Sequence, residues 1–221
     1  MIFSIAVVLV LAGSAWAVSY FRSWRRGEAL NPVAQRIGFL HLHDGFAVPF
    51  RDALNHGYGR TCRNLLTGHY AGTETMLFDY EYTPESVETD VFGFSRNKQT
   101  VAAFHLKDAL PDFHLVTKSW GHKVGTAGAR CNIAFDDVPV FSQHYVLSGQ
   151  DEAAIRRLFT PELRASLTGM DRLWTIQSWK GWVIFYVAQS TVEPIGLAHF
   201  LGQASNLFLR LAGRLAPQRI Q

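Results

Sequence analysis

Two histidines spaced two residues apart are the first candidates for chemistry in this sequence. On a β-strand, the side chains of His41 and His43 would project from the same face, where both imidazoles could bind one metal ion. Asp44 follows and offers a carboxylate ligand. Three distant histidines could complete such a site, namely His69, His105 and His144. A metal-dependent hydrolase is therefore one hypothesis, but no HExxH or paired Cys/His spacing supports it, and we assign no metal ligand and no cofactor.

Two pairs of acids are candidates for general acid and base catalysis. Asp79 and Glu81 lie on one face of an alternating segment, and Asp136 and Asp137 are consecutive on an expected turn. A half-buried antiparallel strand turns its polar face to solvent, and aspartates are common in turns. We interpret both pairs as solvent-facing or turn-forming, and we assign no catalytic residue.

Cysteines, tryptophans and glycines supply the remaining candidates. Cys62 and Cys131 lie in no CxxC motif and are expected to be reduced thiols. The glycine-rich segments 57–59 and 121–128 lack the spacing of phosphate-binding loops and are interpreted as ordinary loops. Three tryptophans on one expected hairpin could line a pocket, although core packing is the preferred interpretation: Trp174, Trp179 and Trp182.

The elements that would position these residues begin with an uncharged segment. A helix over residues 2–21 would be about 30 Å long, which is the thickness of the hydrocarbon core of a bilayer. Arg22, Arg25 and Arg26 follow at once. We predict a transmembrane anchor with a basic flank over residues 1–26, so that the lipid bilayer is the first partner. Because basic flanks stay on the cytoplasmic side, we expect a single-pass protein of the inner membrane with its domain in the cytoplasm.

A second interpretation of the same segment stays open. Ala15-Trp16-Ala17 has the small residues that signal peptidase accepts, so cleavage there would release an exported ligand-binding domain. The order of charges argues against it, because the arginines follow the apolar run, whereas a signal peptide carries its basic residues in front.

The remaining sequence, residues 27–221, has the composition of one folded domain. Hydrophobic residues make up 48% and charged residues 18% of the 221-residue chain, and the net charge is +3. That charge is too small, and its arginines too dispersed, for a nucleic-acid surface. We expect a single soluble α+β domain that binds no nucleic acid.

Periodicity and turn residues predict an antiparallel sheet closed by an amphipathic C-terminal helix, and a pleckstrin-homology-like arrangement is one compatible architecture. The expected strands include three hairpins and cover 61–70 with 73–83, 99–106 with 113–118, 138–147, and 173–179 with 182–189. Residues 183–188 are apolar on both faces, which predicts a central strand. The expected helices cover 32–39, 151–158, 160–167 and the residues from Pro194 onward.

Several motifs resemble those of uncharacterised bacterial single-span membrane proteins. They are Asn64-Leu65-Leu66-Thr67-Gly68-His69-Tyr70, Phe78-Asp79-Tyr80-Glu81-Tyr82, Leu110-Pro111-Asp112-Phe113 and the segment from Tyr145 to Leu163. The resemblance implies a bacterial membrane location and carries over no catalytic residue. With the motifs above, it favours a membrane-anchored, non-enzymatic binding or scaffolding domain with an unknown protein or small-molecule partner. The alternatives are a membrane-tethered hydrolase and an exported ligand-binding domain.

Overall fold

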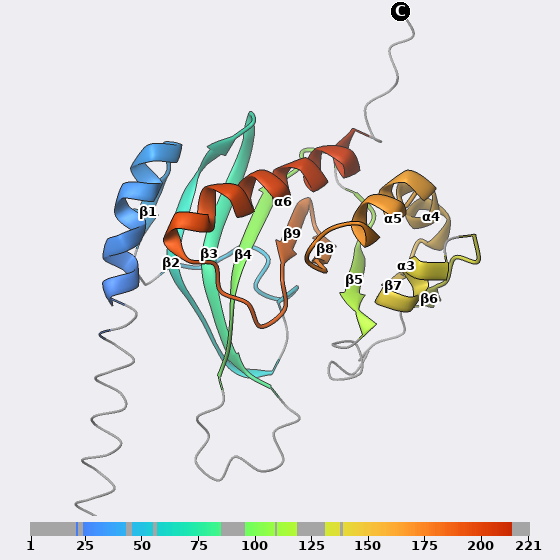
Figure 1. Cartoon of the computed structure of the whole chain (residues 1–221), viewed down its shortest axis with the longest axis horizontal. Coiled ribbons are helices and arrows are strands. Elements are labelled where there is room, and N and C mark those ends of the chain that lie inside the picture. The colour runs from blue at the N-terminus through green and yellow to red at the C-terminus, as the bar shows by residue number, and fades with distance from the viewer. Residues whose placement is uncertain are drawn as a thin grey trace, which may run out of the picture.

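A computed structural model describes residues 21, 24–42, 46–54, 57–84, 96–108, 110–118, 131–137 and 139–213. They form an α+β structure around a nine-stranded antiparallel sheet (Figure 1). The strands are β1 (Leu40–Leu42), β2 (Tyr58–Tyr70), β3 (Thr73–Thr83), β4 (Asn97–His105), β5 (Phe113–Thr117), β6 (Cys131–Ile133), β7 (Tyr145–Gly149), β8 (Thr175–Trp179) and β9 (Trp182–Tyr186). Their order across the sheet is β1-β2-β3-β4-β9-β8-β5-β7-β6.

Helices cover one face of this sheet. A helix over residues 24–37 (blue in Figure 1) precedes β1. The labelled helices are α3 (Pro139–His144), α4 (Glu152–Leu158), α5 (Pro161–Thr168) and α6 (Leu197–Ala212), with a 3-10 turn over Pro194–Gly196 before α6. Side chains from each of these described α-helices share one hydrophobic core with this face of the sheet. The segment 46–54 covers part of the opposite face, where Val48, Phe50 and Leu54 are buried.

The central strand confirms the prediction made from its apolar sequence. All five residues of β9 are buried, with Val183 and Phe185 on the helical face and Trp182, Ile184 and Tyr186 on the other. The hairpins β2-β3 and β8-β9 also form as expected, with turns at 71–72 and 180–181. These hairpins have local turn signals, which explains why the sequence locates them accurately.

The C-terminal helix is amphipathic, as predicted. The buried side of α6 includes Phe200, which stacks on Trp174 at 5.0 Å, and Phe208, which stacks on Phe104 of β4 at 4.8 Å. His199, Asn206 and Arg210 of the predicted polar stripe are exposed, and Gln203 is half-buried; Arg214 lies outside the described residues. The helix therefore closes one face of the sheet rather than standing free in solvent (Figure 1).

Three predicted elements are wrong. Residues 138–147 do not form one strand, because Pro139 opens the short helix α3 before β7 begins at Tyr145. The helix expected over 32–39 instead spans 24–37, since burial of Leu30 and Ala34 outweighs the interruption at Pro32.

The third error concerns pairing. β4 and β5 do not form a hairpin, because β4 pairs with β9, and β5 pairs with β7 and β8. A terminal helix does cap the sheet, as in a pleckstrin-homology-like arrangement, but the strands are not a succession of neighbouring hairpins.

Within the described residues, no helix is both long and apolar enough to cross a bilayer. The span predicted over residues 2–21 lies outside the described part except for Phe21. The glycine-rich segment 121–128 also lies outside it. At the other glycine-rich segment, β2 begins at Tyr58, and Gly57 has a φ of +68°. A Cβ at Gly57 would lie 1.9 Å from the carbonyl oxygen of Thr83, so this position accepts only glycine.

Candidate functional site

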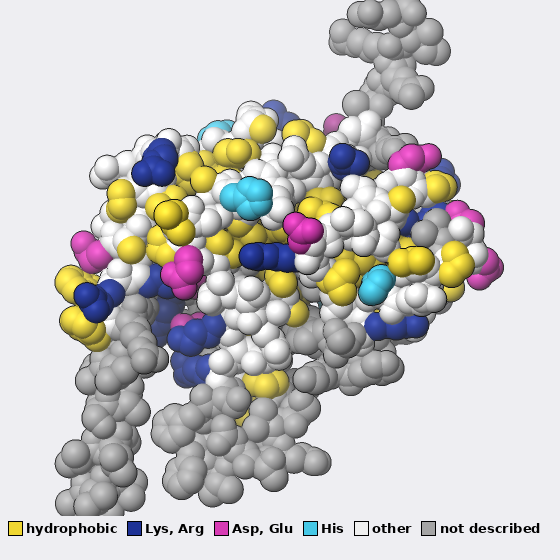
Figure 2. Space-filling view, in the orientation of Figure 1, with side chains coloured by type: hydrophobic (Ala, Val, Ile, Leu, Met, Phe, Trp, Pro, Cys, Tyr) yellow, Lys and Arg dark blue, Asp and Glu magenta, His cyan; other side chains and the backbone are white. Residues whose placement is uncertain are grey.

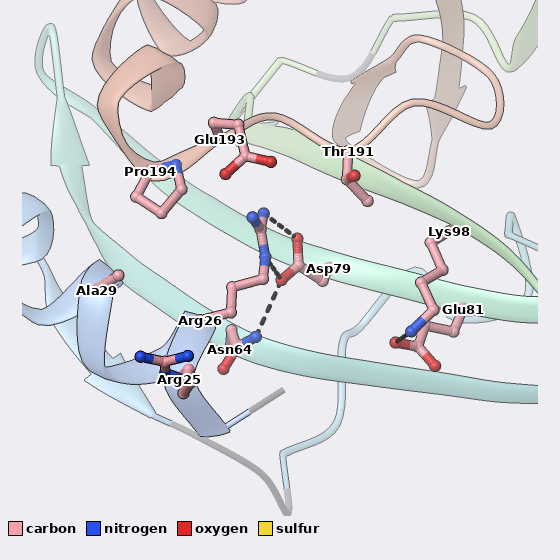
Figure 3. A pocket seen from close by; sticks show the side chains of 10 residues that line it. All are labelled: Arg25, Arg26, Ala29, Asn64, Asp79, Glu81, Lys98, Thr191, Glu193 and Pro194. Carbon is pink, nitrogen blue, oxygen red and sulfur yellow. Dashed lines mark hydrogen bonds and ion pairs between the residues drawn. The ribbon is translucent and has the colours of Figure 1, made fainter. Parts of the chain in front are cut away.

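A cavity of about 470 Å³ opens beside the first turn of the 24–37 helix. It lies between this helix, strands β2 to β4 and the segment that leads into α6 (Figure 3). The residues that line it are mostly charged or polar: Arg25, Arg26, Ala29, Asn64, Asp79, Glu81, Lys98, Thr191, Glu193 and Pro194. It therefore joins residues from five separate parts of the chain, namely the helix, the three strands and the segment before α6.

Arg26 reaches the cavity because of its position on the helix. Leu30 and Ala34 follow it at intervals of four residues, and both are 2% exposed in the core. Residues four apart share one face of a helix, so the packing that buries Leu30 also turns Arg26 toward the sheet. The guanidinium thus lies at the edge of the core, over β3.

Arg26 forms a two-pronged ion pair with Asp79 of β3. Its Nε lies 2.7 Å from Oδ2 of Asp79, and its Nη2 lies 2.8 Å from Oδ1. Nη2 also donates to the carbonyl oxygen of Val192 at 2.8 Å. The side chains are 20% and 8% exposed, respectively. Burial lowers the pKa of Arg26, but the hydrogen bond to Asp79 and the charges of Asp79 and Glu193 raise it on balance, so the guanidinium remains charged.

Two polar residues complete the shell around Asp79. Asn64 donates from Nδ2 to Oδ2 at 3.0 Å, and the Thr100 hydroxyl donates to Oδ1 at 3.2 Å. The Thr100 oxygen accepts a hydrogen bond from the backbone N–H of Val192 at 2.9 Å. Asn64 has a φ of +53° at a register shift in β2, a conformation that asparagine tolerates better than most residues. The carboxylate therefore has donors on both oxygens.

Glu81 forms a second ion pair two residues along β3. Lys98 lies directly opposite it on β4, and the Nζ to Oε1 distance is 2.9 Å. Arg96 approaches the other carboxylate oxygen at 3.7 Å. The prediction that Asp79 and Glu81 face solvent is therefore wrong, since as whole residues, backbone included, they are only 6% and 7% exposed. Alternation does place them on one face, but that face is covered by a helix whose arginine compensates the buried charge.

Arg25 and Glu193 form no ion pair with the described residues. Both are exposed, and the Cζ of Arg25 lies 5.5 Å from the ring centre of Phe21. Figure 3 shows them on opposite sides of the cavity, with the Arg26–Asp79 pair between them. The cavity thus contains two satisfied ion pairs and one unpaired charge of each sign.

The histidines considered as metal ligands under the alternative hypothesis do not come together in the described part of the chain. His41 lies on β1, where its Nδ1 is 2.6 Å from Oδ1 of Asn31, while His43 and Asp44 lie outside the described residues. The Nδ1 of His105 lies 3.5 Å from Oε2 of Glu74, and its ring centre lies 4.9 Å from that of Trp182, with the two rings tilted. Across the described residues, no three His, Cys, Asp or Glu side chains gather as metal ligands would.

The other candidate residues serve the fold. Trp174 and Trp182 are buried on opposite faces of the sheet, which confirms that they pack in the core. Asp136 and Asp137 are exposed on a bend, and Asp137 pairs with the buried Arg164 of α5. Burial raises the pKa of the Cys62 thiol to about 11, with a smaller opposing effect from Arg51. This thiol is therefore a weak nucleophile at neutral pH.

The sequence contains the cavity residues but does not reveal the cavity. Arg26 and Asp79 are 53 positions apart in the sequence. Arg26 also belongs to the basic cluster after the predicted anchor, and that location is enough to explain an arginine there without any partner in the domain. One feature of the sequence could have indicated the cavity. Asp79 and Glu81 lie within an apolar strand, and if both faces of that strand are covered, each buried carboxylate needs a cation nearby.

The sequence matches no protein-family model and no curated protein. One solved structure, described as the mycobacterial trehalose monomycolate transport factor A, TtfA, has a similar fold, with a TM-score of 0.59. The match covers 86% of this chain and 96% of that chain at 17% sequence identity. At this identity the likeness establishes a shared fold and nothing further.

Proposed function

We propose that this protein is a membrane-anchored, non-enzymatic binding or scaffolding domain, held at the cytoplasmic face of the inner membrane by a span over residues 2–21. The observation that carries the proposal is the ion pair between Arg26 and Asp79. Arg26 belongs to the basic cluster that follows the span, and it is also part of the folded domain. The first turn after the span is therefore fixed to the sheet, and the domain would have a set orientation on the membrane.

A fixed orientation suits a scaffold or an accessory factor better than a freely tethered enzyme. A flexible linker would let the domain rotate, whereas the buried face of the 24–37 helix ties it to the sheet through Leu30 and Ala34 as well. Asp79, Glu81 and Asp137 each pair with a basic side chain, and the described residues include no group with metal-ligand geometry. The solved structure with the similar fold is described as a transport factor, which is consistent with an accessory role.

A reporter fusion tests the topology. Alkaline phosphatase fused after residue 221 should be inactive, and a fluorescent protein at the same position should be bright, because the domain is expected in the cytoplasm. The protein should also stay with the membrane after alkaline carbonate extraction. High phosphatase activity, or a mature chain beginning at Val18, would overturn the assignment in favour of the exported domain.

A second experiment tests the fixed orientation. Single cysteines at the domain surface, in a background without Cys62 and Cys131, should show a reproducible pattern of protection from a membrane-impermeant thiol reagent in proteoliposomes. In Arg26→Ala the differences in labelling between surface positions should become smaller. They should persist in Arg157→Gln, since Arg157 is exposed and lies on α4, far from the cavity in the sequence. Equal labelling at all positions in the unmodified protein would contradict a scaffold of fixed orientation.

A further inference from the structure

The charges in the cavity specify the kind of ligand that would complete it. Arg26 is paired with Asp79, and Lys98 with Glu81, whereas Arg25 and Glu193 form no ion pair with described residues. A simple anion would pair with Arg25 but would be repelled by Glu193, and a simple cation would meet the reverse problem. A ligand with one negative and one positive group satisfies both ends.

The side chains that line the cavity indicate which negative group and which positive group the ligand would carry. A guanidinium presents a planar fork of donors that matches the oxygens of a phosphate. A carboxylate pairs with an ammonium, but a quaternary ammonium such as choline is usually held by aromatic rings. None of the ten lining residues is aromatic. The cavity therefore favours a primary amine over choline, and it also lacks the aromatic platform on which a sugar would stack.

The predicted position of the cavity relative to the bilayer favours a lipid as the source. Arg25 comes four residues after the end of the predicted span, which is about 6 Å along a helix. The headgroup layer on each side of the hydrocarbon core is about 5–8 Å thick. Arg25 would thus lie at the depth of the lipid phosphates. This step rests on the anchor in the proposed function.

Exposed apolar side chains surround the same end of the domain. Phe21 and Trp24 are 54% and 51% exposed and stack with their ring centres 5.9 Å apart. Ile195 is 95% exposed and follows Pro194, which lines the cavity. Figure 2 shows hydrophobic side chains next to Lys and Arg side chains near the start of the 24–37 helix. Aromatic and basic residues together are typical of a surface at the membrane interface.

We propose that this cavity binds the phosphoethanolamine headgroup of a membrane lipid, with Arg25 at the phosphate and Glu193 at the primary ammonium. The Arg26–Asp79 pair forms the base of the site and fixes the helix that carries Arg25. Thr191 supplies a hydroxyl at the rim. Binding involves no covalent change, so the lipid would act as a positioning ligand for the domain.

Calorimetric titration of the purified full chain in a neutral maltoside detergent tests the site. Glycerophosphoethanolamine should bind saturably with one site per chain. Arg25→Gln and Glu193→Gln should each weaken binding at least tenfold, because each removes one of the two charged contacts. Arg157→Gln and Asp171→Asn are matched controls on exposed residues elsewhere and should leave the affinity unchanged. Absence of saturable binding, or equal affinity in all four variants, would overturn the proposal.

Two further experiments test which headgroup the cavity prefers and whether that headgroup comes from a membrane lipid. Glycerophosphocholine and inorganic phosphate should each bind at least tenfold more weakly than glycerophosphoethanolamine, and equal affinity for phosphate would reduce the cavity to a plain anion site and refute the proposal. In nanodiscs of phosphatidylcholine with one-fifth phosphatidylethanolamine, native mass spectrometry should find phosphatidylethanolamine enriched on the protein and less so on Arg25→Gln. Binding of the soluble probe without this enrichment would contradict the lipid as the source.

The titration in detergent needs no bilayer, so its failure is separable from a failure of the proposed function. A chain shown to be exported or cleaved would lose its anchor assignment, whereas the affinity of the cavity for the soluble probe would still be measured on its own.

Discussion

Two arginines hold distant parts of this domain together, and they do so in opposite ways. At the cavity, Asp79 is the more deeply buried partner, at 8% exposure, and the 20% exposed Arg26 reaches it from the 24–37 helix. At the other end of the sheet, Arg164 of α5 is 3% exposed and its partner Asp137 is 55% exposed. One site therefore buries the anion and the other buries the cation.

The two arginines also differ in what surrounds them. The guanidinium of Arg164 lies 3.9 Å from the ring centre of Phe135 and donates to the carbonyl oxygen of Phe159. It is enclosed by an aromatic ring and backbone and does not line the cavity at Arg26, although its buried Nε has no hydrogen-bond partner among the described residues. Arg26 and Asp79 instead form the base of a cavity whose rim carries Arg25 and Glu193, which form no ion pair with described residues. An ion pair can thus close a core or support an open site, depending on what covers it.

The largest effect should come from Arg26→Ala. The substitution leaves the Asp79 carboxylate buried with only Asn64 and Thr100 as side-chain donors, and stranding a buried charge costs about 3–5 kcal/mol of unfolding free energy. Urea denaturation measures the loss. The double variant Arg26→Met/Asp79→Leu should recover most of it, because neither charge remains. A loss below about 1 kcal/mol in the single variant would show that the two ends do not differ as described.

Asp137→Ala should have a smaller effect of about 1–3 kcal/mol, since it removes the exposed partner and leaves Arg164 buried with the Phe159 carbonyl and the Phe135 ring. The same denaturation experiment measures it. The comparison predicts that the cost ranks below that of Arg26→Ala, and the reverse order would mean that burial of the cation is the more demanding arrangement.

Alkaline pH should weaken the sheet near the cavity through Cys62 of β2. The pKa of this thiol is raised to about 11, mainly by burial, whereas an unfolded cysteine has a pKa of 9.0. Between these values the unfolded chain loses its proton first, so the free energy of unfolding falls as pH rises from about 9 to 11. Below pH 9 the thiol is protonated in both states and has no effect.

Alkylation of Cys62 by iodoacetamide in a Cys131→Ser background follows this titration directly. The rate should stay low through pH 9 and rise toward pH 11 in the folded protein, and the urea-unfolded chain serves as the control. In Arg26→Ala the rise should move to lower pH if loss of the ion pair loosens β2. An unshifted profile would confine the effect of Arg26 to the helical face of the sheet.

The smallest effect should come from Arg156→Gln. Arg156 pairs with Glu152 one helical turn away at 2.7 Å, and both side chains are largely exposed. Exposed pairs of this spacing contribute about 0.3–0.5 kcal/mol, and salt screens them. Thermal unfolding at low and high salt should differ little from the parent protein. A loss comparable with that of Asp137→Ala would indicate that its contact with Phe135, at 5.1 Å, is a main support of this region.

Much of the fold was predictable because its signals are local. Strand β3 occupies the predicted residues 73–83, because the 71–72 turn marks its start and the alternation of apolar and polar residues continues to its end. Pro161 and Pro194 mark the starts of α5 and of the turn before α6. Residues 138–147 failed because a short helix within an apolar segment has too few residues to show its periodicity.

The sequence alone determined an α+β fold, the identity of its central strand and the amphipathic character of α6, since each depends on neighbours within a few residues. Only the tertiary structure decided that β4 pairs with β9 and that Arg26 meets Asp79. Both outcomes join residues more than fifty positions apart, and they depend on how two faces of one sheet are covered. A charged residue in a strand looks the same in sequence whether water or an arginine lies above it, and the free-energy cost of burial distinguishes the two only after the chain has folded.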